Sequence, residues 1–133
     1  MKDFFGSEGA FKKTQRILTR GEIIKMTNLK DWAKEEDVEY AKNKYTKDGF
    51  DYNKAEAGKA DALREMTELL KTLDTELLLS DSSFYEDGVL GWDDILYLPE
   101  LRTLSCAKGL EWPPRLKAYV INSLQKANVA PYF

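Results

Sequence analysis

Few side chains in this sequence could carry out chemistry. The chain of 133 residues contains one cysteine, Cys106, and no histidine. A single cysteine cannot form an internal disulfide or a Cys-x-x-Cys redox pair. Without histidine, the chain also lacks the commonest general base and the commonest metal ligand. Only Arg102 and Lys108 are basic neighbours of Cys106 in the sequence, so we expect a buried, unreactive thiol.

Two adjacent acids, Asp93 and Asp94, could be taken for a catalytic pair, but neighbouring positions of a helix do not face each other. A structural function is favoured instead. With Gly91 as the N-cap of a helix, Asp94 occupies N3, where its carboxylate can accept a hydrogen bond from the Gly91 amide. Leu90 and Ile95 then form the two halves of a hydrophobic staple. We therefore predict that Leu90, Gly91, Asp94 and Ile95 fix the start of this helix.

A large aromatic residue, Trp112, lies between a glycine and two prolines that are typical of a helix start. We expect it to be an aromatic plug between two helices, and stacking on a ligand is the alternative. The acids from Asp81 to Asp87 lack the spacing of a calcium loop, and the glycines form no phosphate-binding motif. We therefore predict no catalytic residue and no metal site, and no cofactor-binding residue can be assigned.

The overall composition excludes several classes of partner. The net charge is −3, from 20 basic and 23 acidic residues, which gives no electrostatic reason to expect nucleic acid. No apolar run has the length of a membrane span, and the first ten residues lack a secretory signal. One cysteine suits a reducing compartment. The expected location is the cytoplasm, with no membrane as a partner.

The spacing of apolar residues predicts helices and no strand. The clearest helix covers residues 53–79, because Leu63, Met66, Leu70, Leu73 and Leu77 recur at steps of three and four. The other expected helices cover residues 10–27, 35–47 and 92–108, and a last one begins at the paired prolines 113 and 114. Together they predict an all-α bundle of five to six helices.

The ends of the chain are expected to lie outside these helices. Residues 1–9 are interpreted as a lead-in, with Phe4 and Phe5 packing on the first helix, and residues 10–133 as one helical domain. Gly21 weakens the first helix by about 1 kcal/mol. The tail from residue 127 onward contains Tyr132 and Phe133, which, with Val129, are expected to pack back on the domain.

The order of these motifs resembles a known family. The segment from Asp87 to Leu104 reads DGVLGWDDILYLPELRTL, and it is followed by Gly109–Arg115, GLEWPPR, and by Tyr119. This pattern is similar to the helical C-terminal domain of bacterial glutaredoxin 2, which has a glutathione-transferase-like architecture. The resemblance places that family's capping motif on Leu90, Asp94 and Ile95. The hydroxyl residue expected at the cap is Gly91 here, which weakens the cap by a few tenths of a kcal/mol.

The resemblance implies that the parent activity is glutathione-dependent thiol–disulfide exchange. In that family a Cys-x-x-Cys motif in a separate thioredoxin-fold domain does the chemistry, and this sequence contains neither. We therefore expect a non-catalytic domain without a cofactor of its own, although glutathione is implied for the parent protein. Its expected partner is a thioredoxin-fold domain in cis or in trans. The chain is either an excised part of a larger enzyme or a natural helical-only protein, and both explanations stay open.

A docking domain should expose an apolar patch of several hundred Å². The first helix and the helix that begins after Gly91 are the expected docking surface, by analogy with the family. The alternative is a stand-alone helical module that binds another protein. A carboxylate-based hydrolase ranks last, because helical spacing brings no convincing pair of acids together.

Overall fold

The structure is a computed structural model, and it describes residues 4–6, 8–28, 34–77 and 91–133. These residues form helices and no strand, so the predicted all-α fold is confirmed. The elements in chain order are α1 (Ala10–Asn28), α2 (Glu35–Thr46), α3 (Tyr52–Ala57), α4 (Lys59–Thr72), a π-helical turn η1 (Leu73–Leu77), α5 (Trp92–Leu104) and α6 (Pro114–Lys126).

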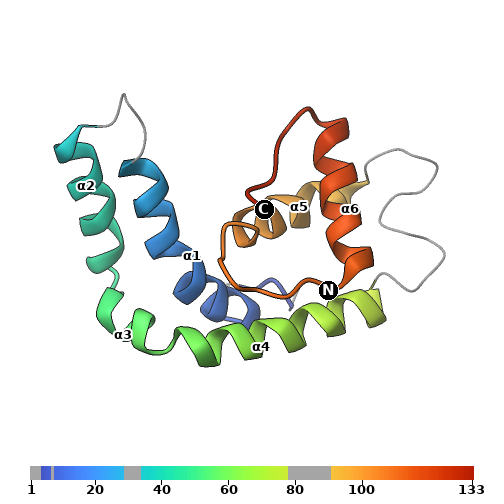
Figure 1. The fold of residues 1–133 in the computed structure, drawn as a ribbon, viewed down its shortest axis with the longest axis horizontal. Coiled ribbons are helices and arrows are strands. Elements are labelled where there is room, and N and C mark those ends of the chain that lie inside the picture. The colour runs from blue at the N-terminus through green and yellow to red at the C-terminus, as the bar shows by residue number, and fades with distance from the viewer. Residues whose placement is uncertain (1–3, 7, 29–33, 78–90) are drawn as a thin grey trace.

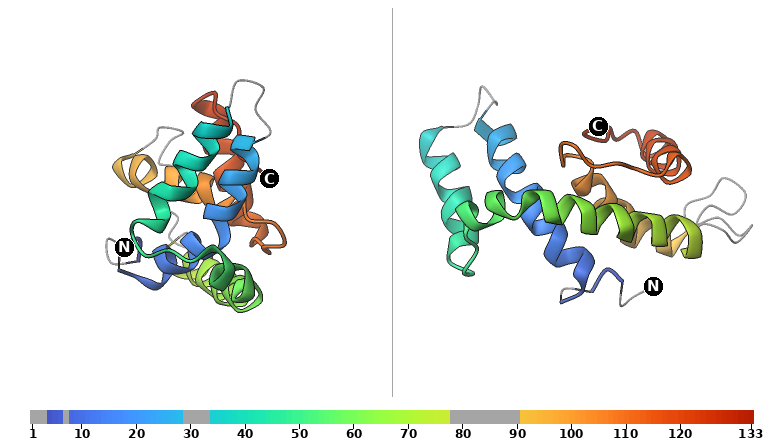
Figure 2. Two further views of the ribbon diagram at one scale, coloured as in Figure 1. Left: turned by 90° about the vertical axis from the view of Figure 1, so that its left-hand side faces the viewer. Right: turned by 60° about the horizontal axis from the view of Figure 1, so that its bottom comes forward.

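Helix α4 runs along one side of the molecule, below α1, α5 and α6 in the view of Figure 1. Helix α1 crosses α4 and packs mainly against it, as the second view of Figure 2 shows. Helices α2 and α3 lie at one end of the molecule, and α5 and α6 lie at the other. Helix α1 contacts elements at both ends, because it packs against α2 and α3 as well as α5.

The core lies where the predicted apolar seam of α4 meets α1, α5 and α6. Met66, Leu70 and Leu73 of that seam are fully buried, and Leu63 is partly buried against them. Each fully buried side chain of this size contributes about 1.5–3 kcal/mol of transfer free energy. The residues that meet this seam from the other helices are Phe11 and Leu18 of α1, Leu98, Leu101 and Leu104 of α5, and Leu116, Val120 and Leu124 of α6.

The lead-in is part of this core. The ring of Phe5 is 4.7 Å from the ring of Phe11 and stacks at 4.4 Å on that of Tyr97, and Phe4 is 5.5 Å from Phe11. The predicted packing of both phenylalanines on the first helix is therefore confirmed, and Phe5 also reaches α5. The first helix continues through Gly21 to residue 28.

The prediction of one helix over residues 53–79 is wrong. Asp51 caps a short helix by accepting hydrogen bonds from the amides of Asn53 and Lys54. Helix α3 then ends at Gly58, where φ is −89° and ψ is 2°, and α4 begins after it. Glycine is the weakest helix former apart from proline, so the chain bends at this position. The bend turns α3 toward α1, against which Ala55 is buried.

The predicted end of the fourth helix at Lys108 is also wrong, because α5 ends at Leu104. The hydroxyl of Ser105 donates to the carbonyl of Arg102 at 2.6 Å and accepts the Tyr132 amide at 2.8 Å. Serine side chains that bond to nearby backbone compete with the helix in this way. Gly109, with a φ of +81°, instead forms the turn that follows.

The tail folds back on α5, as predicted for Tyr132 and Phe133. The Arg102 side chain donates to the carbonyl of Ala130 at 2.9 Å, and its guanidinium lies 4.4 Å from the Tyr132 ring centroid. Phe133 meets Trp112 edge to face at 5.0 Å. Val129, Tyr132 and Phe133 remain 37%, 38% and 43% exposed, so the tail covers the domain only in part.

Candidate functional site

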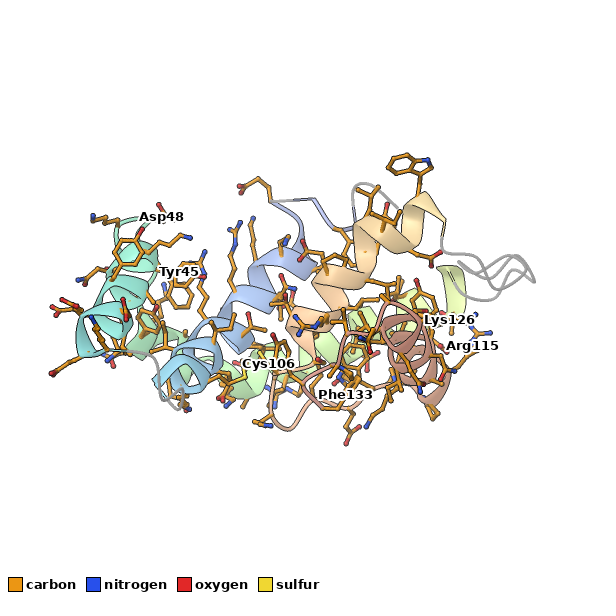
Figure 3. All side chains as sticks on the ribbon, turned by 90° about the horizontal axis from the view of Figure 1, so that it is seen from above. Tyr45, Asp48, Cys106, Arg115, Lys126 and Phe133 are labelled. Carbon is orange, nitrogen blue, oxygen red and sulfur yellow. The ribbon has the colours of Figure 1, made fainter. Side chains whose placement is uncertain are left out.

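The single thiol lies inside the molecule. Cys106 is 2% exposed and follows the end of α5, between the two ends of the bundle (Figure 3). Burial, followed by the negative charge of Glu22, raises the pKa of Cys106 to about 11, and the positive charge of Lys108 opposes this shift. The thiol is therefore protonated at neutral pH, and a protonated thiol is neither a good nucleophile nor a metal ligand.

The predicted capping acid, Asp94, connects α5 to α6 through hydrogen bonds. Asp94 is fully buried, and its carboxylate accepts the Gly91 amide at 2.7 Å. The same carboxylate also accepts a short hydrogen bond from the hydroxyl of Tyr119 on α6. Sequence reasoning proposed the first bond and missed the second, although Tyr119 was among the residues of the motif. Leu90, the other half of the proposed staple with Ile95, lies outside the described residues.

Trp112 lies in the connection between α5 and α6. It is partly buried and packs against the core, and Phe133 covers one edge of its ring. The side chain of Asp93 lies outside the described residues. Within the described ranges, no three His, Cys, Asp or Glu side chains gather closely enough to hold a metal ion.

A polar cluster fixes the position of α5 relative to α1. The carboxylate of Glu100 on α5 forms a short ion pair with the Lys12 ammonium group and accepts the Gln15 side-chain amide at 3.2 Å. The same amide donates to the Glu100 carbonyl at 2.9 Å. Both Lys12 and Gln15 belong to α1. Because Gln15 is buried, these bonds are partly shielded from water and hold the two helices at one angle.

The outward face of α5 is apolar and uncovered. Trp92, Ile95 and Leu96 are 80%, 55% and 59% exposed, and we call these three residues the α5 ridge. Positions three and four apart share one face of a helix. The opposite face, which contains Tyr97 and Leu101, is buried in the core. The ridge is therefore an exposed apolar patch on a helix whose inner side is fixed.

Helix α1 carries a cationic strip. Lys13, Arg16 and Arg20 follow the spacing i, i+3 and i+7, which places them on one side of α1, beside Lys12. The Arg20 guanidinium stacks 4.3 Å from the ring of Tyr45, and desolvation, followed by the charge of Arg16, lowers its pKa. Phe50 lies 4.7 Å from the same guanidinium, so Arg20 is held at the α2–α3 end of α1.

The comparison with protein families shows to which family the chain belongs. The family model described as Glutaredoxin 2, C terminal domain, matches residues 11–133. The chain belongs to this family. The match runs from the start of α1 to the tail, so the resemblance read from the sequence is confirmed. Neither the search of curated proteins nor the search of solved structures found a match.

None of the described helices of this glutaredoxin 2 C-terminal domain combines the length and the apolar character that crossing a bilayer requires.

Proposed function

We propose that this chain is a non-catalytic docking domain of a glutaredoxin 2-like, glutathione-dependent thiol–disulfide oxidoreductase. The α5 ridge would pack on a thioredoxin-fold domain, in cis or in trans. The observation that carries this proposal is the exposure of Trp92, Ile95 and Leu96 on a helix whose other face is buried. Large apolar side chains that cluster in this way on a surface mark interaction sites.

The lack of a reactive thiol supports the non-catalytic part of the proposal. Thiol–disulfide exchange begins with the attack of a thiolate on a disulfide sulfur. Cys106 is buried and protonated at neutral pH, and the sequence contains no second cysteine that could resolve a mixed disulfide. The redox step and the binding of glutathione would therefore belong to the partner domain, in a reducing compartment such as the cytoplasm.

The rigidity of the α1–α5 pair supports the docking part. The bonds from Glu100 to Lys12 and Gln15 fix α5 against α1 before any partner arrives. A surface that is already ordered loses less conformational entropy when it binds.

Chemical-shift mapping tests this proposal. The isotope-labelled chain would be titrated with an unlabelled thioredoxin-fold domain from a glutaredoxin 2. We expect perturbed amide signals along α5, around the ridge, and on the adjoining side of α1, and unchanged signals around Tyr40 of α2. Perturbations confined to α2 and α3, or none at millimolar partner concentration, would contradict the proposed docking surface.

A further inference from the structure

A groove of about 500 Å³ lies between α1, α2 and α3. Sites for small molecules usually have volumes of about 300–1,000 Å³ and mainly apolar walls. Ile17, Ile24 and Val38 form much of the wall of this groove. The complete lining consists of Ile17, Gly21, Ile24 and Lys25 of α1, Val38 and Lys42 of α2, and Tyr52, Ala55 and Glu56 of α3.

The groove is separate from the proposed docking surface. Helical spacing places Ile17, Gly21 and Ile24 on one side of α1, whereas Lys12, which pairs with Glu100 of α5, lies on another side. Figure 1 shows α2 and α3 at the end of the molecule away from α5. A ligand in the groove would therefore not compete directly with a partner on the α5 ridge.

One wall of the groove contains an unsatisfied polar group. Within the described residues, the Tyr52 hydroxyl is the buried side-chain group that has no hydrogen-bond partner. Buried polar groups in native proteins nearly always have a partner, so an exception needs an explanation. A water-sized group in the groove cannot touch this oxygen, so a bound molecule supplies the missing acceptor only when the Tyr52 ring turns toward it.

A glycine keeps the groove open. Gly21 lies inside a helix of 19 residues, where glycine is a much weaker helix former than alanine. A Cβ atom added at Gly21 would meet no atom within 4 Å. Packing inside the chain therefore does not require glycine at this position. The missing side chain leaves free space in the wall, which a ligand can use.

The charges around the groove favour an anion. Lys25 and Lys42 line it together with one acid, Glu56. Lys25 pairs with Glu22 at 3.2 Å, but Glu22 is shared with Lys59 at 3.4 Å, so this group keeps a net positive charge. Lys42 forms no ion pair with another described residue. The rim is therefore cationic beside apolar walls.

From these four observations we propose that the groove binds a small amphipathic anion, which has an apolar body and one carboxylate or sulfonate group. The body lies between Ile17, Ile24 and Val38, and the anionic group lies toward Lys25 and Lys42. When the Tyr52 ring turns toward the groove, an oxygen of the ligand accepts a hydrogen bond from its hydroxyl. This site goes beyond the proposed docking function and does not depend on it.

The test uses the whole chain and the fluorescent aromatic sulfonate 8-anilinonaphthalene-1-sulfonate as the probe. We expect saturable binding to one site. The variant Gly21→Leu fills the groove and should weaken binding at least roughly ten-fold, and Lys42→Glu should weaken it roughly two- to five-fold through the lost charge attraction. Lys71→Glu, which makes the same charge change on α4 outside the groove, is the control and should leave binding unchanged.

A competition experiment tests the chemical class of the ligand. Decanoate should displace the probe at lower concentration than decanol, because only decanoate carries the anionic group. Gly21→Ala serves as a milder variant if Gly21→Leu does not give a native circular dichroism spectrum. Binding that survives filling at Gly21, or that is lost in Lys71→Glu, would overturn the proposed site. Equal displacement by decanoate and decanol would overturn its preference for anions.

Discussion

The carboxylate of Asp94 and the hydroxyl of Tyr52 are both buried polar groups, and they belong to helices at opposite ends of the bundle (Figure 1). Asp94, at the α5–α6 end, accepts hydrogen bonds from Gly91 and Tyr119. The Tyr52 hydroxyl, at the α1–α3 end, has no partner within the described chain. The same small domain therefore satisfies its buried polar groups at one end and leaves one unsatisfied at the other.

This difference separates two kinds of surface. At the α5–α6 end the polar groups bond to each other, and the side chains left for contact are the apolar ones of the α5 ridge. Such a ridge suits the broad surface of a protein partner. At the α1–α3 end, a concave space coincides with an unpaired hydroxyl and unpaired charge, which suits a small ligand.

The largest effect is expected from removing the Asp94 carboxylate, whose hydrogen bonds satisfy buried polar groups at the α5–α6 end. Asp94→Ala leaves the Gly91 amide without its cap and the Tyr119 hydroxyl without its acceptor, so we expect a loss of about 3 kcal/mol in the free energy of unfolding. Urea denaturation measures it. Asp37→Ala is the matched control, because Asp37 caps the Lys34 amide at 2.9 Å on an exposed helix end. Asp37→Ala should lower the free energy of unfolding by about 0.5–1 kcal/mol. Equal losses in the two variants would contradict the proposed difference between the two capping acids.

The buried thiol at the end of α5 should react slowly. Its pKa of about 11, against an ordinary value of 9.0, means roughly a hundred-fold less thiolate below pH 9. We expect Ellman's reagent at pH 8 to modify Cys106 at least roughly a hundred-fold more slowly in the folded chain than in urea. Because folding raises this pKa, the contribution of Cys106 to stability should be constant below pH 9 and fall as the pH rises toward 11. Fast modification of the folded chain would refute the burial of Cys106.

Because the Tyr52 hydroxyl has no hydrogen-bond partner within the described residues, replacing Tyr52 by phenylalanine should stabilise the folded chain. Tyr52→Phe removes a buried group that has no partner, and we expect thermal unfolding to show a gain of about 1 kcal/mol. Tyr45→Phe provides a comparison, because Tyr45 is a partly buried tyrosine that packs on Arg20 in the same region. It should not stabilise the chain. A loss of stability in Tyr52→Phe would show that the hydroxyl already has a partner.

The smallest expected change in stability comes from Gly21 on α1, where an added side chain would enter open space. Gly21→Ala should raise the free energy of unfolding by about 0.5–1 kcal/mol, because alanine favours the helix and its Cβ meets open space. Gly49→Ala is the contrasting variant, since Gly49 has a φ of +81° and alanine there is strained. Chemical denaturation should show opposite signs for the two variants. A destabilising Gly21→Ala would mean that the space beside α1 is filled.

Local signals in the sequence determined much of the fold. The start of α5 at Gly91 follows from the acid at N3, and α6 starts at Pro114 because proline suits the first turn. The seam of α4 was visible because Met66 and Leu70 repeat with helical spacing. The resemblance to the glutaredoxin 2 C-terminal domain rested on the same local motifs, and the family match confirmed it.

Features that depend on distant contacts could not be predicted. The alanines on both sides of Gly58 favour a helix, so the break there was missed, although the glycine itself was a signal. The bond from Tyr119 to Asp94 joins positions 25 residues apart. The groove forms where α1, α2 and α3 come together near Tyr52. The residue spacing within one segment cannot predict such a space.

Calorimetric titration with a thioredoxin-fold domain from a glutaredoxin 2 tests the central claim most directly. The unmodified chain should bind, and Leu96→Asp should weaken binding at least roughly ten-fold, about 1.4 kcal/mol, because it places a charge in an apolar contact. Tyr40→Asp changes a residue of α2 that is 71% exposed, and it should bind as the unmodified chain does. Equal binding by both variants, or no binding by the unmodified chain, would contradict the proposed docking surface.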